Sequence, residues 1–305
     1  MKPGSKTIRG VALACLLACA VSFSPVGAVQ PTVVMSGATS AIATGVPGAH
    51  VLRDIAYGDH PRQRFDLYLP VTTRRAPLIV IVHGGAWANG DKNHPGLIPE
   101  KARHWLPRGY ALLSTNYRLV PDASPLDQVR DVAQALAHVK RHAGDWKIDA
   151  DNIVLLGHSA GAHLVALLAA SPDLRGEAQA NSVRGAILLD SAAYDVQHVM
   201  GKPHPALYDR AFGSDPDDWR AASPFARLSR GAPPMLAVCS TGHLRAACEQ
   251  AHRFARRAAD LDVRVDVLPQ DLSHMEINRH LGRPSSYTER IDAFLDHVLA
   301  GRGAP

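Results

Sequence analysis

The chain has 305 residues, of which 46% are hydrophobic and 20% charged, and its formal net charge at pH 7 is +5. This composition is that of an ordinary folded protein, and it excludes a membrane protein or a disordered chain. Three basic residues lie before residue 29, so the rest of the chain carries 30 basic and 28 acidic residues. No run of like charge stands out, and a nucleic-acid partner is therefore not expected.

Residues 1–28 have the parts of a secretory signal peptide. Basic residues within positions 2–9 form its charged start, residues 11–23 are apolar, and Val26-Gly27-Ala28 supplies small residues for cleavage. The apolar stretch is too short to span a bilayer, so no stable membrane insertion is expected. Leu16-Leu17-Ala18-Cys19 resembles a lipoprotein signal only loosely, because leucine fits poorly two places before the cysteine. We expect an exported protein, periplasmic or secreted, without a lipid anchor.

The mature chain is predicted to begin with a flexible lead-in over residues 29–50, which are small, polar and interrupted by Gly and Pro. Residues 51–57 and 63–69 alternate apolar and polar side chains, which predicts an edge hairpin. Residues 77–82 form an unbroken apolar run, as expected of a strand covered on both faces.

From residue 77 onward, predicted strands alternate with predicted helices. The further strands cover residues 110–115, 151–156, 185–189, 235–239 and 263–268, and the helices cover residues 125–142, 162–170, 246–261 and 286–299. This alternation predicts one domain over residues 51–305, built on an eight-stranded, mostly parallel sheet with helices on both faces. Residues 196–234 are rich in Pro, Gly and Asp and are predicted to form a small lid-like excursion over the site.

The pentapeptide Gly157-His158-Ser159-Ala160-Gly161 stands between a predicted strand and a predicted helix. In that context a G-x-S-x-G sequence is a nucleophile elbow, whose serine sits on a strained turn between flanking glycines. The helix N-terminus adds partial positive charge where an oxyanion would develop. Ser159 is therefore the candidate nucleophile.

The segment His83-Gly84-Gly85-Ala86-Trp87 directly follows the first fully buried strand. Its two glycines allow the backbone to turn sharply and to present N–H groups outward. We expect the amides of Gly85 and Ala86 to join that of Ala160 in an oxyanion hole. His83 is expected to hold the loop by hydrogen bonding rather than to act on substrate.

These two motifs, in this order and each after its own strand, resemble the α/β-hydrolase superfamily. More narrowly, they are similar to the exported carboxylesterase and feruloyl-esterase-like group related to the hormone-sensitive lipase branch, over residues 51–299. The resemblance implies an α/β-hydrolase fold and hydrolysis of short-chain or aryl acyl esters, small-molecule substrates, through an acyl-serine. The sequence contains no metal-ligand cluster, phosphate loop or dinucleotide fingerprint, so no cofactor is expected.

The resemblance also selects the general base among the 16 histidines of the chain. In the resembled fold the base lies on the loop after the last strand, and here that strand is predicted to end near residue 268. His274 is therefore the expected base, and His280 is a weaker competitor.

The third member of the triad departs from the resembled pattern. The acid normally follows the penultimate strand, but residues 239–248 contain no carboxylate, and His243 stands about where the aspartate should be. Three explanations are open. In the first, the acid follows the preceding strand, with Asp190 as the leading candidate and Asp195 as the second. Alternatively, the enzyme works as a Ser–His dyad with His274 oriented by a backbone carbonyl or by His243, or the site is degenerate.

Cys239 and Cys248 are the only cysteines after the predicted cleavage site, and they close a short loop. In an oxidising compartment such a pair is expected to form a disulfide. Two rival functions remain open. An arylformamidase would share the His-Gly-Gly-x-Trp loop, and a catalytically weak ligand-binding descendant would account for the missing acid.

Overall fold

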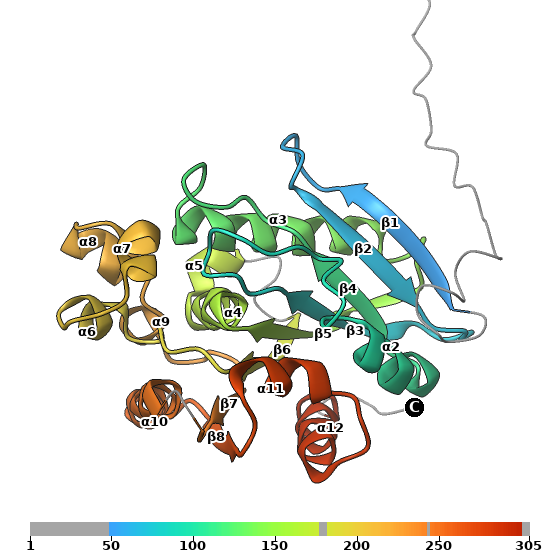
Figure 1. Ribbon diagram of the computed structural model, residues 1–305. Helices are drawn as coiled ribbons and strands as arrows, with labels where there is room; N and C mark the ends of the chain where they lie inside the picture. The colour runs from blue at the N-terminus through green and yellow to red at the C-terminus, as the bar shows by residue number, and fades with distance from the viewer. Residues whose placement is uncertain (1–48, 177–181, 243–244, 301–305) are drawn as a thin grey trace, which may run out of the picture. The chain divides into compact units, whose positions relative to one another are not determined.

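An eight-stranded sheet in the order β1-β2-β4-β3-β5-β6-β7-β8 organises the computed structural model, which describes residues 49–176, 182–242 and 245–300 (Figure 1). The strands are β1 (His50–Ala56), β2 (Arg64–Leu69), β3 (Ala76–Val82), β4 (Ala111–Thr115), β5 (Ile148–His158), β6 (Val183–Leu189), β7 (Met235–Ser240) and β8 (Val265–Gln270). β2 is antiparallel to β1 and β4, and the pairings from β4 through β3 to β8 are all parallel. The predicted eight-stranded, mostly parallel sheet is confirmed.

The register of the parallel strands brings distant parts of the chain to one edge of the sheet. Val82 at the end of β3 lies opposite Gly157 of β5, so the loop after β3 leaves the sheet beside the elbow. His158 at the end of β5 lies opposite Leu189 at the end of β6. Consequently Ser159 and Asp190, each one residue further on, leave the sheet side by side.

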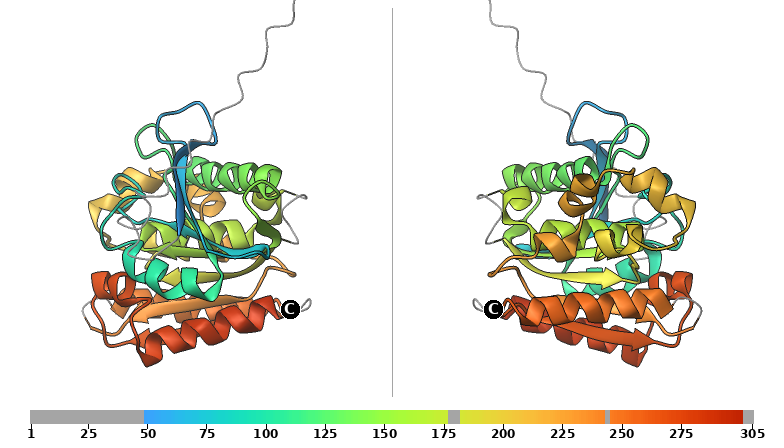
Figure 2. Two further views of the ribbon diagram at one scale, coloured as in Figure 1. Left: turned by 90° about the vertical axis from the view of Figure 1, so that its right-hand side faces the viewer. Right: turned by 90° about the vertical axis from the view of Figure 1, so that its left-hand side faces the viewer.

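Both faces of the sheet are covered by helices, and each face has its own core. Along β3, Leu78, Val80 and Val82 contribute to one core, while Ile79 and Ile81 contribute to the other, as the unbroken apolar run predicts. The first core is closed by α3 (Pro125–His142), α4 (Ala160–Ala170) and α10 (Arg245–Ala259). The second is closed by α2 (Pro99–Trp105), α11 (His274–His280) and α12 (Ser286–Leu299). Figure 2 shows these layers and the strong twist between β1 and the strands at the opposite end.

Two helices of the second layer were not predicted. α2 and α11 have only seven residues each and lie where the sequence indicated connecting segments. α2 begins with Pro99 in its first turn and continues into the short helix η1 (Leu106–Arg108). α11 begins with a capping box formed by Ser273 and Glu276.

The fold also begins slightly earlier than predicted. Ala49 is buried and His50 opens β1, so the last two residues of the predicted lead-in, residues 29–50, belong to the fold. The predicted signal peptide, residues 1–28 with Cys19, and the rest of the lead-in lie outside the described residues. Within the described ranges, no helix combines the length and the apolarity needed to cross a membrane.

The predicted excursion over residues 196–234 consists mainly of four short helices. They are α6 (Val196–Met200), α7 (Ala206–Phe212), α8 (Pro216–Ala221) and α9 (Pro224–Arg227), and they follow the small helix α5 (Pro172–Arg175) and β6 in the chain. The side chains of Asp195, Asp215 and Ser223 cap the starts of α6, α8 and α9. Residues of α6 and α7 line the same cavity as Ser159, so the excursion borders the candidate site. Its action as a lid stays a prediction.

Candidate active site

Ser159 occupies the sharp turn between β5 and α4. Its backbone has φ 56° and ψ −119°, a conformation that is strained for a residue with a side chain. A Cβ atom on Gly157 would lie 2.2 Å from the carbonyl oxygen of Gly161. A Cβ atom on Gly161 would lie 2.2 Å from the carbonyl oxygen of Val82. Both glycines of the motif are therefore required by close backbone contacts, the second of them with the strand that precedes the His83 loop.

The loop after β3 passes directly against this turn. A Cβ atom on Gly84 would lie 2.9 Å from Cβ of Ser159. Gly85 and Ala86 both have positive φ, 124° and 51°. The backbone N–H groups of Gly85, Ala86 and Ala160 have no acceptor among the described residues, so all three amides are available to a ligand.

The His83 ring fixes the start of this loop. Its Nδ1 donates to the carbonyl oxygen of Gly84 at 2.7 Å. The ring of Tyr117 stacks on it with centroids 4.4 Å apart, and the Tyr117 hydroxyl donates to the His83 carbonyl oxygen at 2.9 Å. Burial lowers the pKa of His83 to about 4, so the imidazole is neutral at pH 7. These contacts agree with the loop-holding role expected for His83.

Asp190 follows β6 and is hydrogen bonded to His274. The carboxylate Oδ2 lies 2.7 Å from Nδ1 of His274, and Oδ1 accepts the backbone N–H of Ser240 at 2.7 Å. Asp190 has only 2% of its surface exposed, so both contacts are shielded from water. The backbone of Asp190 has φ 56°, and its N–H donates to the carbonyl oxygen of Val238. Strands β6 and β7 together therefore fix the direction of the carboxylate.

His274 is the first residue of α11, where the sequence indicated a loop. A helix begins directly at His274 because Ser273 and Glu276 form a capping box at its N-terminus. Its carbonyl oxygen accepts a hydrogen bond from Nε2 of His158 at 2.8 Å. Both the backbone and the ring of His274 are thus held, and the ring borders the same cavity as Ser159.

The other candidates for these roles have different partners. Asp195 caps α6 through the N–H of His198 and forms an ion pair with Nε of Arg253 at 2.5 Å. His280 lies at the far end of α11, seven residues into the helix. His243, considered as a substitute for the acid, lies outside the described residues.

The two histidines that flank Ser159 in sequence are buried and neutral. Burial and the nearby His274 lower the pKa of His158 to about 3. Burial lowers the pKa of His163 to about 4. Nδ1 of His163 accepts the indole N–H of Trp87 at 3.1 Å, and Nε2 donates to the carbonyl oxygen of Ala222 at 2.7 Å. His163 therefore joins the loop after β3 to the excursion.

Sequence reasoning missed two groups that support the site. One is the backbone N–H of Ser240, which has no side-chain signal. The other is Lys101 of α2, which is buried and donates to the carbonyl oxygen and to Oδ1 of Asn278 in α11, at 2.6 and 3.1 Å. Burial lowers the pKa of Lys101 to about 7. Lys101 is one of four ionisable residues in the seven-residue helix α2, so residue type alone did not distinguish it, and its partner lies 177 positions further along the chain.

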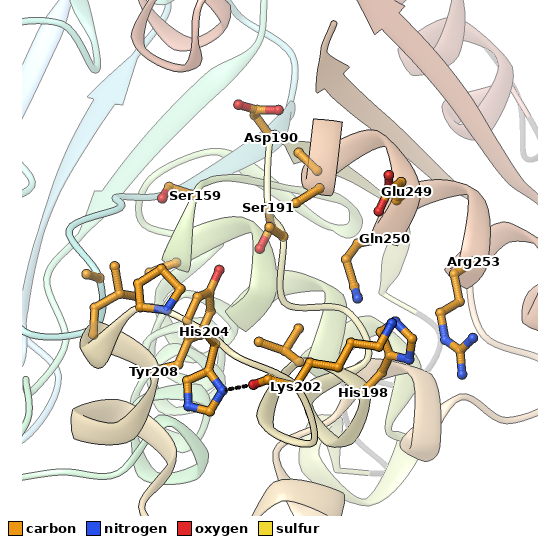
Figure 3. A pocket seen from close by; sticks show the side chains of 18 of the residues that line it. Ser159, Asp190, Ser191, His198, Lys202, His204, Tyr208, Glu249, Gln250 and Arg253 are labelled. Atoms are coloured by element: carbon orange, nitrogen blue, oxygen red, sulfur yellow. Dashed lines mark hydrogen bonds between the residues drawn. The ribbon is translucent and has the colours of Figure 1, made fainter. Parts of the chain in front are cut away.

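Two cavities meet at Ser159 and His274. The larger has a volume of about 740 Å³ and extends between α6, α7 and α10 (Figure 3). The smaller has a volume of about 420 Å³ and runs along the loop that follows β3. The described residues include no group of three or more His, Cys, Asp or Glu side chains that could hold a metal ion.

A disulfide joins Cys239 of β7 to Cys248 of α10, as their position in the sequence predicts. Cys239 directly precedes Ser240, whose N–H contacts Asp190, and Cys248 lies within a turn of residues that line the larger cavity. The bridge therefore connects the support of Asp190 to one wall of that cavity.

Comparison with known proteins relates the chain to esterases. The BD-FAE family model matches residues 65–257. The probable isoprenylcysteine alpha-carbonyl methylesterase ICMEL1 of Arabidopsis thaliana is 35% identical over 135 residues, covering 44% of this chain and 28% of the plant protein. The probable carboxylic ester hydrolase LipM of Mycobacterium tuberculosis is 31% identical over 220 residues, covering 66% of this chain and 50% of LipM. Among solved structures, Thermogutta terrifontis esterase 2 phosphoramylated by tabun has a TM-score of 0.66 and 25% identity, covering 85% of this chain and 97% of the esterase.

The chain spans half or less of the length of these two curated relatives. The matched family region nevertheless contains more than half of the chain, and it includes the loop after β3, the elbow and Asp190. The chain belongs to the BD-FAE family, within the esterase group of the α/β-hydrolases that its two motifs resemble.

Proposed function

We propose that the protein is an exported serine esterase that cleaves carboxylic esters of short-chain or aryl acyl groups through an acyl-serine intermediate. The observation that carries the proposal is the 2.7 Å hydrogen bond between Asp190 Oδ2 and His274 Nδ1, beside a cavity that Ser159 also lines. In this hydrogen bond Asp190 provides a carboxylate partner for His274. The lack of a carboxylate after β7 was the reason for considering a dyad or a ligand-binding protein. The names of the relatives, an ester hydrolase, a methylesterase and an esterase, support the same reaction class.

In the proposed mechanism Oγ of Ser159 attacks the ester carbonyl carbon while Nε2 of His274 takes the hydroxyl proton. The carbonyl oxygen becomes an oxyanion and accepts hydrogen bonds from the amides of Gly85, Ala86 and Ala160. Each such donor contributes about 3–4 kcal/mol of transition-state stabilisation. The tetrahedral intermediate then expels the alcohol, which receives the proton from His274.

Water completes the cycle by the same route. It attacks the acyl-serine carbonyl carbon and gives a proton to Nε2 of His274, and collapse of the second intermediate breaks the acyl–Oγ bond. The carboxylic acid leaves, and Ser159 recovers its proton. Throughout, the Asp190 carboxylate holds Nδ1–H of His274, which keeps Nε2 free to accept a proton and stabilises the imidazolium when it forms.

The first test measures the pre-steady-state burst of p-nitrophenol from p-nitrophenyl acetate. Wild type is expected to give a burst, and Ser159→Ala is expected to give neither burst nor labelling by a fluorophosphonate probe. Ser214→Ala, which alters an exposed serine between α7 and α8, should keep both. Equal bursts from wild type and Ser159→Ala would overturn the proposal.

N-formylkynurenine separates the esterase from the arylformamidase alternative. The esterase proposal expects kcat/KM for aryl acetates to exceed that for N-formylkynurenine, and the reverse order would favour the arylformamidase.

Export is tested by N-terminal sequencing of the protein from the native host or a Gram-negative host. Cleavage after Ala28 is expected, and retention of Met1 in the cytoplasm would contradict export.

A further inference from the structure

The larger cavity has one reacting end and one end that is rich in positive charge. Ser159 lies at one end of it, whereas Lys202 and Arg253 lie at the opposite end, with His198 beside Lys202 (Figure 3). Arg256, one helical turn after Arg253 in α10, also lines it. Among the described residues that line it, the only carboxylates are Asp190, which is bonded to His274, and Glu249.

Arg253 is held in a fixed orientation. Its Nε pairs with the buried carboxylate of Asp195 at 2.5 Å, and its guanidinium carbon lies 5.0 Å from the centre of the Phe225 ring. Its two terminal nitrogens have no acceptor among the described residues. An arginine that is oriented by one acid while its terminal N–H groups remain available suits a planar anion.

Lys202 and Arg256 have no carboxylate partner among the described residues. The ammonium group of Lys202 lies 3.0 Å from Nε2 of His198, and this contact involves no carboxylate. Lys202 and Arg256 therefore bring positive charge to this end of the cavity that no ion pair within the described ranges neutralises.

We infer that the substrate is an ester that also carries a carboxylate, remote from the scissile bond, and that this carboxylate binds between Lys202, Arg253 and Arg256. The inference rests on the proposed esterase function. It extends that function because the cavity is larger than a short neutral acyl group requires, and because an anion there would form charge-assisted hydrogen bonds. The carboxylate can belong to the acyl part or to the alcohol part, and the two sources are separated by experiment.

The test compares matched pairs of substrates at low ionic strength. On the acyl side, the mono-p-nitrophenyl ester of adipic acid is compared with the p-nitrophenyl ester of adipamic acid, in which an amide replaces the carboxylate. On the alcohol side, 3-(4-acetoxyphenyl)propionate is compared with its amide. We expect kcat/KM to be at least about fivefold higher for the carboxylate member of one pair, and this preference to shrink in 0.5 M salt.

Substitutions then test which side chains cause the preference for the carboxylate ester. Lys202→Gln and Arg256→Gln should each lower kcat/KM for the preferred carboxylate ester about three- to fivefold and leave the matched amide unchanged. Lys202→Glu should lower it further, and Lys202→Arg should retain it. Arg141→Gln, which removes an exposed charge on α3 outside the cavity, is the matched control and should change neither substrate.

The outcomes distinguish this inference from the proposed function. Turnover of the amide esters without any preference for the carboxylate esters would overturn the inference and leave the esterase proposal intact. A preference that survives Lys202→Glu and Arg256→Gln unchanged would also overturn it. Absence of turnover for every ester, together with an unlabelled Ser159, would overturn the proposed function and this inference with it.

Discussion

At the scale of single residues, the direction of the Asp190 carboxylate decides which tautomer of His274 is present. Asn in its place can donate its amide to Nδ1, which stabilises the tautomer protonated at Nε2 and removes the base. Asp190→Asn is therefore expected to lower kcat by about 10³–10⁴-fold with little change in KM. Steady-state kinetics on p-nitrophenyl acetate measure both constants.

Asp195→Asn is the control for this substitution. Asp195 also follows β6, but it caps α6 and pairs with Arg253 rather than with His274. Its loss should lower the melting temperature and leave kcat for a small neutral ester within about tenfold of wild type. Equal losses of kcat in the two variants would contradict the role proposed for Asp190.

Gly161 gives a second prediction at this scale. A Cβ atom there would lie 2.2 Å from the Val82 carbonyl oxygen and 2.5 Å from that of His83, and backbone atoms cannot yield as a flexible side chain can. Gly161→Ala is expected to lower the free energy of unfolding by about 3 kcal/mol and to displace the elbow, so that activity falls with it. Gly144→Ala is the matched control, because no atom lies within 4 Å of a Cβ there. Urea unfolding should show Gly144→Ala unchanged or slightly stabilised, and similar stability of both variants would refute the steric argument.

Sequence patterns predicted the local parts of the site better than the partners that hold them. The elbow and the His83 loop could be identified because their glycines are required by close backbone contacts within each motif or between the two. The sequence left open whether the acid is Asp190, Asp195 or absent, since both aspartates follow β6 and differ only in the partners that tertiary packing gives them. The contact of Asp190 with the Ser240 amide depends on the pairing of β6 with β7, and this pairing cannot be predicted from the types of the residues involved.

At the scale of elements, long periodic segments were predicted correctly and short helices were missed. α3 begins and ends as expected because Ser124, Pro125 and Asp127 mark its start and its apolar side chains recur at helical spacing. α2 and α11 are too short for such periodicity to show. The start of α11 did carry a signal, the Ser273–Glu276 capping box, and this signal would have placed His274 on a helix.

The disulfide between β7 and α10 gives the prediction that belongs to this scale. Its loop is short, with a sequence separation of nine, so removing it is expected to lower the free energy of unfolding by about 2–3 kcal/mol. The activity of Cys239→Ala/Cys248→Ala should fall as well, because the bridge adjoins the Ser240 amide that orients Asp190. Chemical unfolding with and without reductant provides the measurement and its control. Reductant should shift the midpoint of wild type and leave the double variant unaffected, and a midpoint common to both proteins without reductant would refute the contribution of the bridge.

At the scale of the whole fold, the parallel strands collect the site from segments that are far apart in the chain. The His83 loop, Ser159, Asp190 and Ser240 lie at or directly after the carboxyl ends of β3, β5, β6 and β7, and His274 follows β8 closely. In an open parallel sheet these ends form one edge, which is why strand order alone indicated where the site would lie. The charged end of the larger cavity was not predictable in this way, because it depends on how α6 and α10 pack beside that edge.

The packing around the site buries three neutral imidazoles and makes the stability of the fold depend on pH. Burial lowers the pKa of His83 and His163 to about 4, and burial together with His274 lowers that of His158 to about 3. In the unfolded chain these histidines titrate near 6.5. Between pH 6.5 and about 4 the unfolded state therefore binds protons that the folded state does not, so the free energy of unfolding falls as pH is lowered. The limiting slope is about 1.4 kcal/mol per pH unit for each imidazole.

Urea unfolding at pH 7, 6 and 5 and constant ionic strength measures this dependence. We expect a loss of roughly 2–4 kcal/mol between pH 6 and pH 5, within the limit set by three imidazoles. Carboxylates with lowered pKa, such as Asp127 and Glu276, act in the same direction but at lower pH, whereas the raised pKa of His204 acts in the opposite direction. His163→Gln isolates one group. It should be less stable than wild type at pH 7, because a buried ring is lost, yet its slope between pH 6 and pH 5 should be about one third shallower. Wild type that is equally stable at pH 7 and pH 5 would show that these imidazoles accept protons without unfolding, contrary to their complete burial.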